Sequence, residues 1–180
     1  MRIILIGFMG VGKTSVGKKL AKNLEVDFID TDCEIEKYAN RTIPDIFEIY
    51  GENHFRELET KVLKDLIQKD DIIISTGGGI IISKENREIL KDEEKIIFLD
   101  ANAETIIEHL SKEVNKRPLL KDSENLHKRI NELMSMRYNK YKEVCDICID
   151  VNGKNIDEVV RQILVYISWF MILLYSNECN

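Results

Sequence analysis

Short apolar runs alternate along the chain with longer stretches in which apolar residues recur every three to four positions. The runs predict five strands, at residues 2–6, 27–30, 71–75, 95–99 and 146–150. The longer stretches predict helices that begin near Gly12, Asp32, Glu52, Ser83, Ala103 and Ser123. Because strands that alternate with helices form parallel sheets, the pattern predicts one α/β domain.

The two prolines mark local features of this pattern. Thr42 followed by Pro44 predicts an additional helix start, with threonine as the N-cap and proline in the first turn. Pro118 lies in the polar segment 111–123, which interrupts an otherwise continuous helical pattern. We therefore expect a mobile lid at about 111–123.

The C-terminal stretch changes character along its length. Residues 156–167 carry apolar side chains at helical spacing, whereas from 163 to 175 only Ser168 breaks the apolar run. A bilayer-spanning helix needs about twenty apolar residues, so no firm membrane insertion is expected. We place the domain at 1–167. The apolar tail, 168–180, is expected to form a dimer contact or to adsorb loosely to a membrane; otherwise we expect a monomer.

Composition and charge narrow the classes of protein. Hydrophobic residues make up 44% of the chain and charged residues 32%, as in a folded domain. The formal net charge of -6 argues against a nucleic-acid partner, so any phosphate site must be local.

The first apolar run is short and leads directly into glycines, unlike a signal peptide, and a cytoplasmic location is expected. Cys145 and Cys148 form a lone CxxC without a second ligand pair, which disfavours a metal or redox role.

The first candidate chemistry follows the first strand. The segment GFMGVGKT, residues 7–14, fits the phosphate-binding pattern GxxxxGK(S/T) and stands between a strand and a helix. Backbone N–H groups of such a loop bind phosphate oxygens at the positive end of the helix. Lys13 is expected to neutralise the β and γ phosphates of ATP as a catalytic group, and Thr14 to ligate Mg2+. The predicted ATP-binding residues here are Gly10, Val11, Gly12, Lys13, Thr14 and Ser15.

This loop, called the P-loop below, does not by itself separate a kinase from a GTPase or an ATPase. No NKxD-type motif follows, which disfavours a G protein.

Asp30 and Asp32 end the second predicted strand, at the sheet edge that also carries the P-loop. If strand geometry persists, both side chains point to the same side. One carboxylate would hold magnesium through water and the other would orient or deprotonate an acceptor hydroxyl. The alternative is that Asp32 only caps the next helix.

Taken in order, the segments GFMGVGKT, DTD, FRELE, GGG, RPLL and RYNKY resemble the shikimate kinase signature across residues 2–163. The resemblance implies a three-layer P-loop kinase fold, with a five-stranded parallel sheet flanked by helices and a mobile lid. It also implies phosphorylation of the shikimate 3-hydroxyl by ATP with Mg2+, a step of chorismate and aromatic amino-acid biosynthesis. By the same resemblance Asp32 is a catalytic residue at the acceptor hydroxyls and Asp30 is the metal partner. The third strand lacks the usual Walker B aspartate, as it does in this family.

Three arginines fall on the motifs of this family. The chain has 18 lysines and 8 arginines, so arginine is not its default surface cation. The resemblance makes Arg56 and Arg137 ligands of the shikimate carboxylate, and carboxylates favour the planar guanidinium. It makes Arg117, in the predicted lid, a catalytic and ATP-binding residue that reaches the transferring phosphoryl group. For Arg56 the alternative is an ordinary surface ion pair with Glu59.

The triple glycine and the adenine side complete the predicted site. Gly77, Gly78 and Gly79 follow a strand and would expose backbone N–H groups to the substrate. Members of the family commonly carry an arginine that stacks on the base near the start of the lid, but this chain reads EHLSKEV there. His109 or Lys112 is a candidate replacement, and Asn152 in the loop 151–155 is expected to contact the adenine.

Two other functions remain open at this stage. One is a kinase for a different small acceptor, such as gluconate or a nucleoside monophosphate. The other is an ATP-binding regulatory module without turnover. The second is disfavoured because the nucleotide and acceptor motifs are both intact.

Overall fold

The computed structural model describes residues 1–110 and 126–177, with side chains up to Trp169. Five strands form one parallel sheet in the order β2-β3-β1-β4-β5. Their bounds are β1 Arg2–Gly7, β2 Asp27–Asp30, β3 Ile72–Ser75, β4 Ile96–Asp100 and β5 Ile147–Asp150. All five predicted strands are therefore confirmed, with ends that differ by one residue at most.

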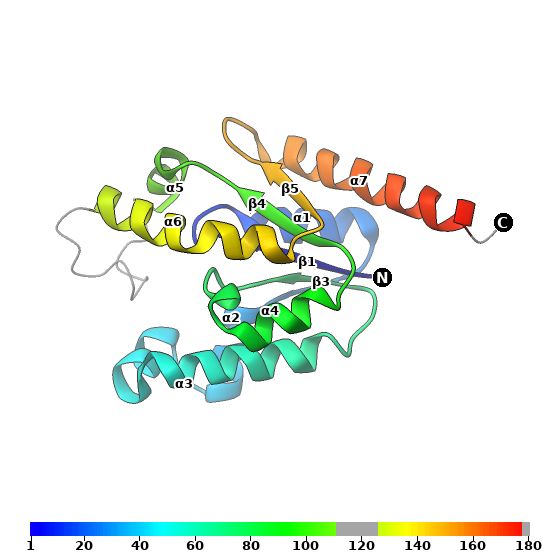
Figure 1. Cartoon of the computed structure of the whole chain (residues 1–180). Coiled ribbons are helices and arrows are strands. Elements are labelled where there is room, and N and C mark those ends of the chain that lie inside the picture. Colours follow the sequence, from blue (N-terminus) through cyan, green and yellow to red (C-terminus); the bar gives the residue numbers. More distant parts are fainter. Residues whose placement is uncertain (111–125, 178–180) are drawn as a thin grey trace.

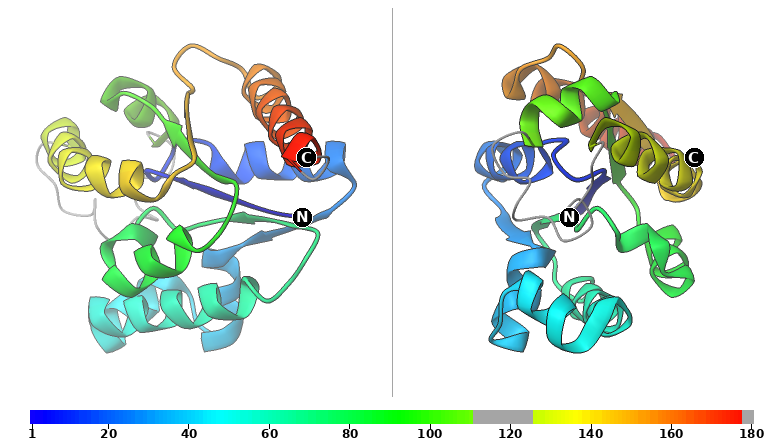
Figure 2. Two further views of the ribbon diagram at one scale, coloured as in Figure 1. Left: turned by 45° about the vertical axis from the view of Figure 1, so that its right-hand side comes forward. Right: turned by 90° about the vertical axis from the view of Figure 1, so that its left-hand side faces the viewer.

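Helices cover both faces of this sheet and give three layers (Figures 1 and 2). Within the described ranges the helices are α1 Lys13–Leu24, α2 Thr31–Ala39, α3 Ile43–Leu66, α4 Lys84–Lys91, α5 Ala103–Leu110, α6 Leu126–Val144, α7 Ile156–Asn177 and a 3-10 turn, η1 Ile80–Ile82. Apolar residues of α1, α5, α7 and the start of α6 share one core with the sheet. Residues of α2, α3, α4 and the end of α6 share the other. The predicted fold class is confirmed, and the predicted lid at 111–123 lies outside the described residues.

The alternation of side chains along β1 explains why its sequence is apolar throughout. Ile3 and Leu5 belong to one core and Ile4 and Ile6 to the other, and all four are fully buried. A parallel strand with helices on both faces has no solvent side, so it does not alternate with polar residues.

Two predicted helix starts, at Thr42 and near Glu52, are found in the single element α3. The Thr42 hydroxyl accepts a hydrogen bond from the Asp45 backbone N–H at 3.3 Å, which confirms it as the N-cap. The helix is interrupted at Gly51, which has φ 80° and ψ 174°. Glycine tolerates this backbone conformation because it has no Cβ, so the chain bends there and resumes as a helix.

The helix α7 continues without a break through position 167, where we place the end of the domain. Val159, Val160 and Ile163 are buried against the core, while Val165 and Trp169 are 58% and 66% exposed. The end of α7 extends beyond the sheet (Figure 1). Among the described residues, no helix has the length and apolar content needed to cross a membrane. The role of 168–180 stays a prediction.

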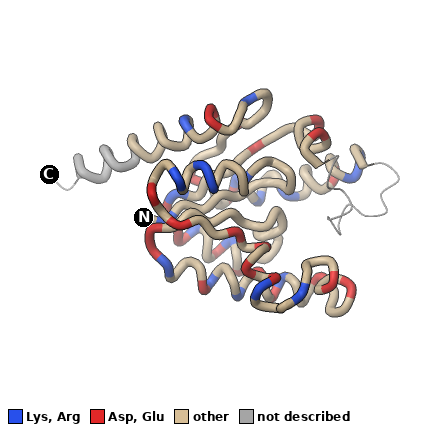
Figure 3. The backbone as a smooth tube through the Cα atoms, turned by 180° about the vertical axis from the view of Figure 1, so that it is seen from behind, with Lys and Arg blue, Asp and Glu red and all other residues tan. Residues whose placement is uncertain are grey.

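Charged residues of both signs are distributed along the described helices (Figure 3). The side chain of Lys13, at the start of α1, is buried.

Candidate active site

The carboxyl ends of β1, β2 and β3 meet at one edge of the sheet. Ser75 of β3 is in register with Asp30 of β2 on one side and with Leu5 of β1 on the other. The P-loop, Asp30 and the triple glycine each follow one of these strand ends. The prediction that these motifs share one edge is confirmed.

The P-loop turns sharply between β1 and α1. Gly10 and Gly12 have φ of 80° and 97°, a left-handed conformation that favours glycine. The Lys13 ammonium group donates hydrogen bonds to the carbonyl oxygens of Gly7 at 2.8 Å and Phe8 at 2.9 Å. Lys13 therefore folds back over the loop and holds a buried positive charge there, close in sequence to the start of α1, where backbone N–H groups favour an anion.

Asp30 connects the P-loop to two neighbouring strands. Its Oδ2 accepts hydrogen bonds from the Thr14 hydroxyl at 2.8 Å and from the Ser75 hydroxyl at 3.0 Å. Its Oδ1 accepts from the Asp32 backbone N–H at 3.0 Å, so Asp30 is the N-cap of α2. The alternative that Asp32 caps this helix is therefore wrong.

Strand geometry does not persist to Asp32, because α2 begins at Thr31. The condition under which alternation would place Asp30 and Asp32 on the same side is therefore not met. Asp30 contacts the P-loop, while Asp32 lies beside Gly77, where an added Cβ would come within 2.6 Å of Asp32 Oδ1. The helix start therefore places one carboxylate beside the P-loop and the other beside the triple glycine.

Glu59, which we did not predict as a site residue, joins Asp32 at this position. A Cβ on Gly77 would lie 2.9 Å from Glu59 Oε1. The Glu59 side chain is 1% exposed, and burial raises its pKa to about 7, although Arg56 opposes that change. Among the described residues Glu59 Oε1 has no hydrogen-bond partner. Its place at helical spacing from Arg56 is the only sequence signal that could have identified it.

Arg56 is held by two carboxylates of its own helix. Its guanidinium donates to Glu59 and, at 2.8 Å and 3.2 Å, to Glu52. The Arg56 side chain is only 13% exposed, so the alternative of an ordinary surface pair is wrong. Burial opposes the charge of Arg56, but Glu59 and Glu52 outweigh it and raise the pKa of the guanidinium.

Arg137 of α6 also contacts the triple glycine. It is 4% exposed and donates to the Gly78 carbonyl oxygen at 3.2 Å. Its guanidinium lies 5.6 Å from the centre of the Phe8 ring, and burial lowers its pKa. The Tyr141 hydroxyl donates to the same carbonyl at 2.5 Å, and its ring stacks on Phe98. The structure thus brings Arg56 and Arg137 together around the triple glycine.

Each glycine of the triplet faces a different neighbour. A Cβ on Gly77 would collide with Asp32, one on Gly78 would lie 2.8 Å from the Met9 backbone nitrogen, and one on Gly79 would collide with the Arg56 guanidinium. A side chain at Gly78 is therefore excluded by the backbone of the P-loop, whereas one at Gly77 or Gly79 would displace the end of the Asp32 or the Arg56 side chain.

The predicted adenine side is only partly described. Asn152 accepts hydrogen bonds from the Asn102 backbone N–H and the Thr105 hydroxyl, both at 2.9 Å, and its amide nitrogen donates to Asp150. Its side chain is thus engaged in joining two loops. His109 lies at the P-loop, with Nδ1 2.8 Å from the Gly10 carbonyl oxygen. Arg117 and Lys112 lie outside the described residues.

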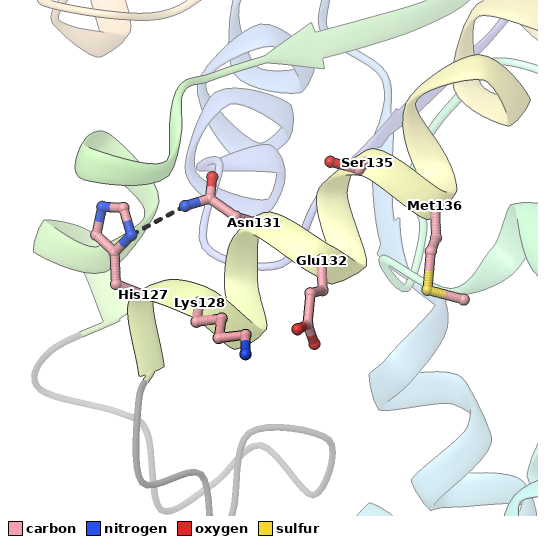
Figure 4. A pocket seen from close by; sticks show the side chains of 6 residues that line it. All are labelled: His127, Lys128, Asn131, Glu132, Ser135 and Met136. Carbon is pink, nitrogen blue, oxygen red and sulfur yellow. Dashed lines mark hydrogen bonds between the residues drawn. The ribbon is translucent and has the colours of Figure 1, made fainter.

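A separate pocket runs along one face of α6 and contains none of the predicted site residues (Figure 4). It is lined by His127, Lys128, Asn131, Glu132, Ser135 and Met136. His127 Nδ1 accepts a hydrogen bond from Asn131 at 2.9 Å, and its Nε2 lies 3.5 Å from Glu104. His127 therefore contributes to local contacts between α5 and α6.

Comparisons with known proteins identify the family of this chain. The family model described as "Shikimate kinase" matches residues 9–168. A shikimate kinase of Enterococcus faecalis is 40% identical over 163 residues, which cover 90% of this chain and 95% of the relative. A shikimate kinase of Caldicellulosiruptor bescii is 44% identical over 150 residues, which cover 83% of this chain and 86% of the relative.

Solved structures give the same result. A shikimate kinase from Acinetobacter baumannii in complex with shikimate has a TM-score of 0.87 and 36% identity, and the match covers 99% of this chain and 95% of that one. A gluconokinase from Sinorhizobium meliloti has a TM-score of 0.59 and 16% identity, and the match covers 98% of this chain and 96% of that one. At this identity the match shows a shared fold alone. The protein described here belongs to the shikimate kinase family.

Proposed function

We propose that the protein transfers the γ-phosphoryl group of ATP to the 3-hydroxyl of shikimate, which gives shikimate 3-phosphate and ADP. The observation that carries this proposal is the position of the triple glycine. Gly78 lies against the backbone of Met9 in the P-loop, while its two neighbours lie against Asp32 and Arg56. A nucleotide on the P-loop and an anionic acceptor between the arginines would therefore lie next to each other, as direct transfer requires.

On the donor side, the backbone N–H groups of residues 10–15 would bind the phosphates at the start of α1. Lys13 would exchange its two carbonyl partners for phosphate oxygens and neutralise their charge. Arg117 is proposed to act on the transferring group. Because the Asn152 side chain is engaged by Asn102, Thr105 and Asp150, we assign its contact with the adenine to its backbone.

The oxygen ligands beside the P-loop fit Mg2+. The described residues contain no cluster of three or more His, Cys, Asp or Glu that could hold a metal ion. Mg2+ suits a sparser site, because it keeps several waters and takes oxygens from phosphates. Thr14 and Asp30, whose side-chain oxygens are 2.8 Å apart, would hold it, with Ser75 supporting Asp30. The ion would neutralise charge on the β and γ phosphates.

On the acceptor side, Arg56 and Arg137 would bind the shikimate carboxylate with their guanidinium groups. Asp32 would accept a hydrogen bond from the reacting hydroxyl and orient or deprotonate it. Backbone N–H groups of Gly77, Gly78 and Gly79 would bind the substrate at close range. Both arginines are largely buried, so their charges act in a medium that screens them less than water does.

The cellular setting is also a proposal. We infer a cytoplasmic enzyme of aromatic amino-acid biosynthesis that acts on shikimate and ATP and not on nucleic acid. The protein is proposed to be a monomer whose apolar tail, 168–180, allows self-association.

The decisive experiment is an ADP-release assay on the purified protein with MgATP and a panel of acceptors. Shikimate should stimulate ADP release, while gluconate and nucleoside monophosphates at equal concentration should not. Mass spectrometry should find the product at the mass of shikimate plus one phosphoryl group. Stimulation by gluconate or a nucleotide instead of shikimate would contradict the proposal, and binding of ATP without turnover would indicate a regulatory module.

A further inference from the structure

The last turn of α5 holds one peptide of the P-loop by two kinds of contact. His109 Nδ1 lies 2.8 Å from the Gly10 carbonyl oxygen. A carbonyl oxygen only accepts, so Nδ1 carries the hydrogen and donates it. The next residue, Leu110, is 1% exposed and lies beneath Gly10, where an added Cβ would come within 2.7 Å of Leu110 Cγ.

The first turn of α5 is fixed as well. Asn102 Oδ1 accepts a hydrogen bond from the Thr105 backbone N–H at 2.8 Å. Asn152, in the loop after β5, accepts from the Asn102 N–H and from the Thr105 hydroxyl. The helix therefore spans from the loop after β5 to the P-loop, with hydrogen bonds at both ends.

We propose that His109 is a positioning residue that orients the P-loop for phosphate binding. Gly10 has φ 80°, and because glycine has no side chain and wide conformational freedom, the residue itself does not fix the direction of this peptide. The hydrogen bond from His109 fixes the direction of the Gly10 carbonyl group, and with it the peptide that leads to Val11 and Gly12. N–H groups that already point toward the phosphates lose less entropy when the ligand binds.

This inference rests on the proposed ATP-binding function. In it His109 affects ATP binding by orienting the P-loop and not by contacting the adenine base. The competing role, stacking of the imidazole on the adenine, needs a flat ring but no hydrogen donor. Two substitutions separate the roles. His109→Asn keeps a side-chain N–H donor and removes the ring, whereas His109→Phe keeps a flat ring and removes the donor.

The experiment is equilibrium binding of MgATP and of magnesium tripolyphosphate, which has no base, to the wild type and both variants. We expect His109→Phe to weaken the binding of both ligands by about threefold to tenfold, as loss of one hydrogen bond implies. His109→Asn should stay within about twofold of the wild type. In steady-state assays the KM for ATP should rise in His109→Phe while the KM for shikimate stays the same.

Three outcomes would overturn the proposal. His109→Phe could bind both ligands as tightly as the wild type, it could lose affinity for MgATP but not for magnesium tripolyphosphate, or His109→Asn could lose as much affinity for both ligands as His109→Phe does. His109→Ala serves as a second donor-free variant without added bulk, and thermal melting checks that each variant is folded. His127→Ala is the matched control, because His127 is an exposed histidine that contacts α5 through Glu104 and not the P-loop. A wild type that binds both ligands but does not phosphorylate shikimate would contradict the proposed function and leave this test intact.

Discussion

Glu59 provides a prediction that links burial, charge and pH. Its carboxyl group is almost completely buried and contacts Arg56, so two effects oppose each other. Burial favours the neutral acid, and the guanidinium favours the carboxylate. Burial prevails and raises the pKa of Glu59 from its ordinary value of 4.5 to about 7. The folded protein therefore binds this proton more tightly than the unfolded chain does.

The sign and size of the effect on stability follow from this difference. A raised pKa in the folded state contributes stability that is fully present below pH 4.5 and is lost as the pH rises through 7. At roughly 1.4 kcal/mol for each pKa unit, the loss amounts to about 3 kcal/mol. Glutamine cannot titrate, so Glu59→Gln removes this dependence and keeps the shape of the side chain.

The assay is chemical denaturation of the wild type and Glu59→Gln at a series of pH values from 4.5 to 8. The free energy of unfolding of the wild type, relative to the variant, should fall by about 3 kcal/mol across this range. Glu57→Gln, on the same helix but with a side chain that is 78% exposed, is the matched control for removal of a carboxylate. A difference that rises with pH would show that Arg56 outweighs burial and would refute the reasoning.

Three further predictions concern the active site and the tail. Asp32→Asn should keep MgATP affinity and lose about a hundredfold or more of kcat, because general-base groups contribute on this scale; unchanged turnover would remove Asp32 from the mechanism. Gly79→Ala should raise the KM for shikimate and leave the KM for ATP, since the new Cβ collides with Arg56; equal changes in both constants would contradict this account. A truncation that lacks 168–180 should lose self-association in light scattering, and an unchanged mass at all concentrations would exclude a role of the tail in assembly.

Local sequence patterns were sufficient for the five strands and for the α/β class, whereas the three-layer P-loop kinase fold was implied by the family resemblance. The strand β2 was predicted to the residue, and the N-cap at Thr42 was predicted from one threonine and one proline. These features depend on interactions between residues close in the chain, such as capping hydrogen bonds and side-chain periodicity. Two alternatives at the site proved wrong, Asp32 as the cap of α2 and Arg56 in an ordinary surface ion pair. They depended on where a helix begins and on how deeply a side chain is buried, which residue type and spacing do not show.

The sequence by itself determined the P-loop, the order of the strands along the chain and the motifs that resemble the shikimate kinase signature. The tertiary structure alone decided which of these side chains lie together. The burial of Glu59, the steric reason for Gly79 and the contact of His109 with Gly10 each depend on elements distant in the chain that pack at one edge of the sheet. Such contacts are set by how helices pack over a sheet, and no local pattern of residues encodes them.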